Sequence, residues 1–187
     1  MTRSGYLLGL ATAAAAFSAP AHAQNAPRPT FEGPRIEGVV GTDGDLFVGG
    51  AVGYDLQRGR LVLGVEGEFD FSDRKHCAPL YINVNDSYCV GGQRDAYIGS
   101  RIGIAVARTT LIYVKGGYTG LRQRVTYDSG TATGSFRFVA RQDGMRVGAG
   151  IEQRLGRNLY VKGEYRYANY ENGGWKQDGV VGIGFRF

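Results

Sequence analysis

The chain has 187 residues, of which 31 are glycine, 12 tyrosine and 9 phenylalanine, and it carries a formal net charge of +5. This length fits a single domain. Basic and acidic residues are interleaved along the chain rather than gathered in blocks, so the positive balance does not indicate nucleic-acid binding.

The first 23 residues have the three parts of an export signal. Arg3 gives a basic start, and the run "YLLGLATAAAAF" is apolar but too short to span a bilayer. Ala21-His22-Ala23 fits the small-residue cleavage pattern, so we predict a signal peptide over residues 1–23, cleaved after Ala23. Residues 24–34 are rich in proline and predict an extended lead-in. An exported protein meets little nucleic acid, so we expect no such partner.

From residue 35 onwards, apolar and polar residues alternate with a period of two, which is typical of β-strands. Each alternating run is long enough to cross a bilayer when tilted. The predicted strands cover residues 35–41, 46–56, 61–71, 93–106, 111–123, 138–155, 159–170 and 179–187.

The predicted connections alternate between short and long. Short turns on one side and longer loops on the other are typical of outer-membrane barrels. The short turns are 56–60, 107–110 and 156–158, the long polar loops are 72–92, 124–137 and 170–176, and the short connection 42–45 is the exception on the loop side.

The strands have one apolar face and one face of charge and glycine. In a soluble barrel the apolar face would point inward. Here tyrosine and phenylalanine lie near strand ends on the apolar face, as in a membrane-interface girdle, and glycine alternates with charge as in a narrow lumen. We therefore predict that the charged face lines the lumen, where its members must form ion pairs. This predicted lumen network comprises Glu66, Glu68, Arg101, Lys115, Arg146, Glu152, Lys162, Glu164, Arg166 and Arg186, and the same face carries Asp70 and Arg154.

The last strand, "GVVGIGFRF", has an apolar face that we expect to meet lipid, and a closed barrel would pair it with the first strand. The sequence thus predicts an all-β fold, an eight-stranded antiparallel transmembrane β-barrel over residues 35–187. We expect short periplasmic turns and longer extracellular loops.

The export signal, the alternating strands "AVGYDL" and "LVLGVEGEF", and the closing "GIGFRF" together resemble the small eight-stranded outer-membrane proteins of Gram-negative bacteria. These are the opacity-like and surface-antigen porin-like barrels, related in architecture to the OmpA transmembrane domain. The resemblance implies location in the outer membrane, contact with its lipid and lipopolysaccharide, and assembly by the outer-membrane insertion machinery. It also implies that this machinery reads an insertion signal made of Val181, Ile183, Phe185 and Phe187.

The only two cysteines, Cys77 and Cys89, lie in one predicted loop. Export to an oxidising compartment favours a disulfide between them. Closing a ring of this size would contribute about 3 kcal/mol in the chain-entropy model. A thiol nucleophile, or a metal pair with His76, is the alternative.

The function that the sequence predicts is a structural and surface-interaction role without enzymatic activity, cofactor or metal. The outward loops would contact a host or surface ligand. A narrow passive pore and a soluble calyx for an apolar ligand are alternatives. A lipid A-modifying hydrolase is a third, because His76 has Asp73, Ser72 and Ser87 in the same loop.

Overall fold

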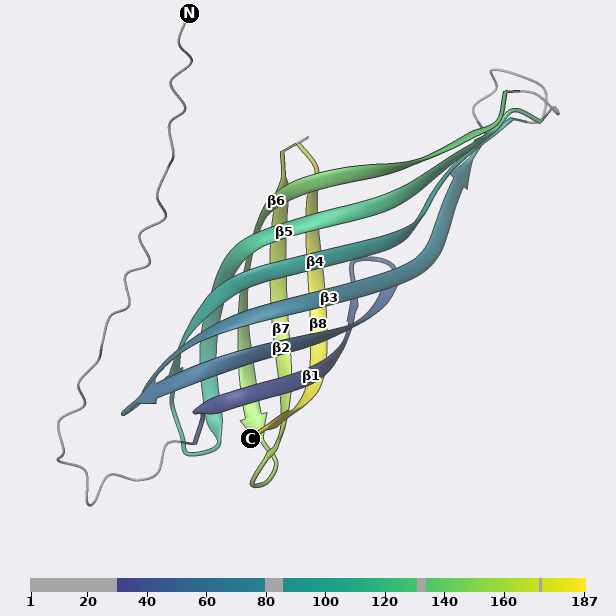
Figure 1. Ribbon diagram of the computed structural model, residues 1–187. Helices are drawn as coiled ribbons and strands as arrows, with labels where there is room; N and C mark the ends of the chain where they lie inside the picture. Colours follow the sequence, from purple (N-terminus) through teal and green to yellow (C-terminus); the bar gives the residue numbers. More distant parts are fainter. Residues whose placement is uncertain (1–29, 80–85, 131–133, 172) are drawn as a thin grey trace, which may run out of the picture.

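The computed structural model describes residues 30–79, 86–130, 134–171 and 173–187, which form eight β-strands (Figure 1). The predicted signal peptide, residues 1–23, and most of the predicted lead-in, 24–34, lie outside the described residues. Within the described part, no helix is long and apolar enough to cross a membrane. The strands are β1 (Gly33–Thr42), β2 (Leu46–Arg58), β3 (Leu61–Ala78), β4 (Ser87–Ala105), β5 (Thr110–Asp128), β6 (Phe136–Arg154), β7 (Leu159–Tyr170) and β8 (Trp175–Arg186).

The sheet closes on itself. Each strand pairs antiparallel with the next, and β8 pairs with β1 from Arg35↔Arg186 to Thr42↔Gly179. Closure removes the free sheet edges whose unpaired backbone groups would be costly away from water. The prediction of an eight-stranded antiparallel barrel is confirmed.

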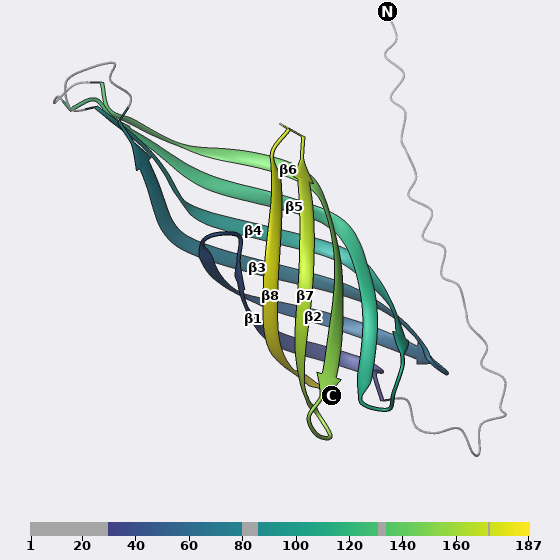
Figure 2. The same ribbon diagram turned by 180° about the vertical axis from the view of Figure 1, so that it is seen from behind.

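The two ends of the barrel differ. At one end, here called the turn end, residues 59–60, 106–109 and 155–158 connect neighbouring strands. Gly59 in the first of these turns has a φ of 60°, a left-handed conformation that glycine adopts without strain. β1 begins and β8 ends at the turn end, where the backbone N–H of Phe187 donates to the carbonyl of Pro34 at 3.0 Å. Figures 1 and 2, seen from opposite sides, place the C-terminus beside these turns.

At the other end, the loop end, four strands continue beyond the barrel (Figure 1). The ladder between β2 and β3 stops at Val48↔Phe71, but β3 and β4 stay paired as far as Ala78↔Tyr88. Likewise the β6–β7 ladder stops at Gly144↔Tyr170, while β5 and β6 stay paired to Tyr127↔Phe136. We call this projecting sheet the extension; it consists of residues 72–78, 87–93, 122–128 and 136–143.

The extension corrects the predicted loops 72–92 and 124–137. Most of their residues lie in strands. The prediction missed these strands because apolar and polar residues do not alternate regularly along them. A β-bulge between Gly91 and Arg94 of β4 lies at the base of the extension, where bulges commonly bend a strand and re-aim its side chains.

The barrel is apolar on the outside and charged on the inside. Outward side chains such as Val65, Ile98 and Val181 are 61%, 68% and 65% exposed, whereas inward Arg166 and Glu152 are fully buried. A soluble calyx requires the opposite arrangement, so that alternative is wrong. The outward apolar surface fits a protein that meets lipid.

Candidate functional site

The candidate site is the lumen, because period-two alternation aims a charged residue of almost every strand at the same narrow space. Seven basic side chains and nine carboxylates are buried there, and the mostly buried Lys176 adds a further positive charge 3.4 Å from Asp178, so the lumen is close to neutral. The buried residues are Arg35, Glu37, Asp55, Glu66, Glu68, Asp70, Asp95, Arg101, Lys115, Arg146, Glu152, Lys162, Glu164, Arg166, Asp178 and Arg186.

The turn-end cluster consists of Arg35, Asp55, Arg101, Glu152 and Arg186. Arg101 makes two parallel hydrogen bonds to Asp55, from Nε at 2.8 Å and from Nη2 at 2.6 Å. Arg186 bridges the two carboxylates, with Nη1 2.5 Å from Asp55 and Nη2 2.8 Å from Glu152. Planar guanidinium groups suit such shared, forked pairing, and this cluster therefore joins β1, β2, β4, β6 and β8.

The middle cluster consists of Glu37, Glu66, Lys115, Lys162 and Glu164. Lys115 Nζ lies 2.7 Å from both Glu66 and Glu164, and Lys162 Nζ lies 2.5 Å from Glu37. Two tyrosine hydroxyls add hydrogen bonds, from Tyr160 to Glu37 at 2.8 Å and from Tyr113 to Glu164 at 2.6 Å. Each carboxylate thus has both a cation and a second donor, as buried charge requires.

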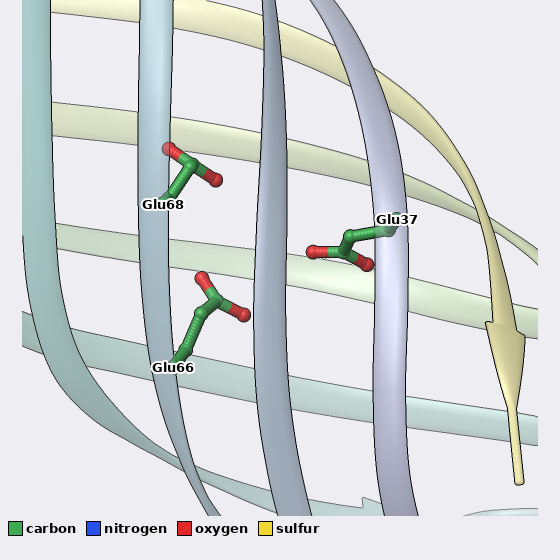
Figure 3. A group of neighbouring side chains, drawn as sticks. All are labelled: Glu37, Glu66 and Glu68. Atoms are coloured by element: carbon green, nitrogen blue, oxygen red, sulfur yellow. The ribbon is translucent and has the colours of Figure 1, made fainter.

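Three carboxylates of the lumen lie close enough together to suggest a metal ion. Figure 3 shows Glu37 on β1 and Glu66 and Glu68 on β3, all projecting into the barrel, with ligand oxygens within 4.8 Å of one another. However, Lys162 and Lys115 place ammonium groups against Glu37 and Glu66, and Arg166 occupies both oxygens of Glu68 at 2.7 and 2.6 Å. These cations already supply the positive charge, so we assign the three carboxylates to ion pairing.

The loop-end cluster consists of Glu68, Asp70, Asp95, Arg146 and Arg166. Arg146 bridges Glu68 at 2.8 Å and Asp95 at 2.5 Å. Thr119 Oγ1 also donates to Asp95, at 2.6 Å. Ion pairs connect the three clusters without a break, along Glu152, Arg101, Asp55, Arg35, Glu66, Lys115, Glu68, Arg146 and Asp95.

Apolar side chains close both ends of this charged column. At the turn end, Phe31 is fully buried against Val62, Ala105, Leu111 and Tyr113. At the loop end, the buried groups are Val39, Phe47 and Val180 on one side and Leu121, Ala168 and Tyr170 on the other. Side chains therefore fill the lumen along its length, as expected for a barrel of this size.

The structure places the residues of the suspected hydrolase on the extension but does not assemble them. Ser72 Oγ donates to the backbone carbonyl of Leu46 at 3.1 Å, and His76 Nε2 contacts the carboxylate of Asp45. Ser87 pairs with Asp128 across β4 and β5. In a serine triad the serine hydroxyl donates a hydrogen bond to the imidazole of the histidine. Ser72 does not make that hydrogen bond to His76.

Cys77 and Cys89 form a disulfide. They are direct partners in the β3–β4 ladder, so the bond joins two paired strands of the extension rather than closing a loop as predicted.

This geometry, with lipid-facing apolar residues outside and an ion-paired lumen inside, agrees with the comparisons. Residues 9–187 match the family described as the outer membrane protein beta-barrel domain. The chain belongs to that family. It is an outer-membrane barrel, and its turn end, which carries the short turns, is periplasmic, so the extension is extracellular.

Relatives and solved structures support the same assignment. The 25 kDa outer-membrane immunogenic protein of Brucella ovis is 29% identical over 144 residues, which cover 76% of this chain and 64% of that protein. The chain thus spans less than two thirds of the length of that relative. The β-barrel domain of Pseudomonas aeruginosa OprF superposes with a TM-score of 0.55 at 14% identity, covering 83% of this chain and 98% of the other. The attachment invasion locus protein Ail of Yersinia pestis gives 0.53 at 15% identity, covering 83% and 99%. These structures are similar in fold.

The structure places all ten predicted lumen residues in buried ion pairs. Sequence reasoning omitted Arg35, Glu37, Asp55, Asp95 and Asp178 from that set, and Phe31 from the lumen. Alternation in "RIEGVV" and "AVGYDL" would have revealed the first three. Arg154, assigned to the same face, is only half-buried at the turn end, where it donates to the backbone carbonyls of Thr30 and Arg157.

Proposed function

We propose that this outer-membrane barrel is a closed, non-enzymatic anchor that presents the extension for contact at the bacterial surface, with a structural role in the envelope. The observation that carries this proposal is the extension itself. A four-stranded sheet, tied by the Cys77–Cys89 disulfide, leaves the membrane on a barrel whose lumen is filled.

The extension has the features of a contact surface. Its outer strands, residues 72–78 of β3 and 136–142 of β6, have no ladder partner on one side among the described residues. Free sheet edges are sites where another chain adds. Phe136 and Phe138 are 53% and 48% exposed, and the Phe136 ring stacks with Tyr127 on one side and with Phe138 on the other, which forms an aromatic patch.

The partner class we propose is a host or surface ligand outside the cell. Ail, which shares the fold, has been solved in complex with the heparin analogue sucrose octasulfate. We therefore choose heparin as the first probe for this chain.

The test is attachment of cells that display the protein to surfaces coated with heparin. We expect the double variant Phe136→Ser/Phe138→Ser to attach less than wild type. Leu155→Ser, which changes an exposed residue of a periplasmic turn, serves as the matched control. Equal attachment by wild type, the patch variant and cells lacking the protein would overturn the proposed contact role.

The filled lumen argues against the passive pore. Reconstitution in planar bilayers is expected to give no steady unit conductance, and a stable conductance would restore the pore hypothesis. The missing Ser72–His76 contact argues against a hydrolase. Lipid A from expressing cells should have an unchanged mass, and a mass change lost in His76→Ala would contradict this part of the proposal.

A further inference from the structure

Three arginines form a row across the outer face of the barrel, at the base of the extension. Arg94 on β4 is the direct partner of Arg122 on β5, and Arg122 is the direct partner of Arg141 on β6. All three are exposed. Residues opposite each other in a ladder share a face, and Phe71, the partner of Arg94 on β3, points outward and is 47% exposed. This arginine row therefore faces away from the lumen.

The arginine row lies at the level where the apolar belt ends. Ile104, Ile112 and Ile151 form a second row of direct partners near the periplasmic end, each about half exposed. In each strand ten residues separate this isoleucine from the arginine. At about 3.3 Å per residue and a tilt of about 40°, ten residues rise by roughly 25 Å, the height of the apolar band of such barrels. The arginines are thus level with the headgroups of the outer leaflet.

No carboxylate among the described residues forms an ion pair with Arg94, Arg122 or Arg141. The one carboxylate that lines the same hollow, Asp143, leaves two of the three positive charges unbalanced. Like charges placed directly opposite each other destabilise a sheet. Three adjacent guanidinium groups therefore call for an anion supplied from outside the chain.

The surface around the row is hollowed. The arginines line a hollow of about 650 Å³ together with Arg124, Phe69 and Tyr118. Gly92, in the bulge of β4, has a φ of 60° and lines the same hollow. The guanidinium groups thus stand directly above aromatic and aliphatic side chains that face lipid, so a ligand here meets positive charge at one end and apolar surface at the other.

We propose that Arg94, Arg122 and Arg141 bind the phosphate groups of lipid A in the lipopolysaccharide of the outer leaflet. Guanidinium forks bind phosphate oxygens in a bidentate manner, which a lysine cannot do. A lipid phosphate suits the place better than a free anion, because its acyl chains would cover the apolar residues below the row. This inference goes beyond the proposed surface contact, and it depends only on the barrel and its membrane level.

The test measures lipid bound to the folded protein in detergent by native mass spectrometry. Wild type is titrated with bisphosphorylated lipid A and with dephosphorylated lipid A. We expect the phosphorylated lipid to bind at least tenfold more tightly. In the variant Arg94→Gln/Arg122→Gln/Arg141→Gln that preference should disappear, since the positive charges and guanidinium forks that bind phosphate are gone.

The matched control, Arg60→Gln/Arg108→Gln/Arg157→Gln, removes the same charge from exposed periplasmic turns and should retain the preference. Arg122→Gln alone replaces the triple variant if that variant does not show the gel shift of a folded barrel. Equal affinity for the two lipids, or an unchanged preference in the arginine-row variant, would overturn the proposal. Displacement of lipid A by equimolar inorganic phosphate would also do so, by marking a site for free anions.

Discussion

Asp55 on β2 and Arg101 on β4 form a two-fold hydrogen-bonded ion pair in the lumen, although 46 positions separate them in the chain. Arg35 and Arg186 donate to the same carboxylate at 3.1 and 2.5 Å. One carboxylate therefore holds three guanidinium groups that would otherwise repel one another in a dry interior.

The first prediction concerns this shared carboxylate. Asp55→Asn keeps the shape but leaves the three guanidinium groups around a neutral amide, so the free energy of unfolding should fall by about 3–5 kcal/mol. Urea unfolding in phospholipid vesicles measures this change. Glu32→Gln, on an exposed residue, should leave the midpoint unchanged. Equal midpoints for the two variants would mean that other groups compensate for the loss of Asp55.

Such pairing shows what the sequence could and could not predict. Period-two alternation in "LVLGVEGEF" predicts that Glu66 and Glu68 share a face, because that depends only on the strand. It does not predict that Glu66 meets Arg35 and Lys115, which are 31 and 49 positions away. Those partners depend on the stagger between strands in the closed barrel.

The extension was missed for a related reason. Its strands "SDRKHCA" and "SYCVGGQ" do not alternate regularly between apolar and polar residues, so there is no period of two to recognise. The arginine row was likewise visible only as scattered charge, since Arg94, Arg122 and Arg141 become neighbours through the ladder.

The second prediction tests close packing of the barrel wall. A Cβ on Gly117 would lie 2.2 Å from the carbonyl oxygen of Ile98 and 2.4 Å from Cα of Gly99. Both are backbone atoms, so no side-chain rotation can relieve the clash. Gly117→Ala should therefore destabilise the barrel by about 1–3 kcal/mol. Gly163→Ala, where a Cβ meets nothing within 4 Å, is the matched control. Equal heat stability of the two variants on cold and boiled gels would contradict this prediction.

The third prediction concerns the proposed insertion signal at Val181, Ile183, Phe185 and Phe187. The Phe187 side chain is 73% exposed, so Phe187→Ala should barely change the stability of the refolded barrel. If the insertion machinery reads this ring, the variant should instead accumulate less in the outer membrane of cells. Phe71→Ala, another lipid-facing phenylalanine, controls for lost lipid contact. Equal amounts of both variants in the membrane would remove Phe187 from the signal.

The fourth prediction separates the extension from the barrel. Cys77 and Cys89 join strands beyond the last β2–β3 pair, so their loss should loosen the extension and leave the barrel wall intact. Cys77→Ser/Cys89→Ser should keep the gel shift of a folded barrel, while trypsin should cleave the extension faster, for instance after Lys75. The oxidised wild type is the control, and the reduced wild type should behave like the variant. Loss of the gel shift would show that the disulfide also supports the barrel.

The fifth prediction tests where the headgroups of the outer leaflet lie along the barrel, because the proposed role of the arginine row depends on that position. Trp175, the one tryptophan of the sequence, begins β8 on the outward face and is 65% exposed. It lies ten residues from the lipid-facing Phe185, which again corresponds to a rise of roughly 25 Å and places the indole at the headgroup level. Indole rings favour that level because they are apolar with one polar N–H.

Fluorescence quenching by spin-labelled lipids measures this depth. A label on the headgroup should quench Trp175 more than a label near the end of an acyl chain. The matched control is Val181→Trp in a Trp175→Phe background, since Val181 is six residues closer to the periplasm on the same outward face. That indole should show the opposite order of quenching. If both positions were quenched more by the deep label, the membrane would extend further towards the extension, and the arginines would lie among acyl chains rather than phosphates.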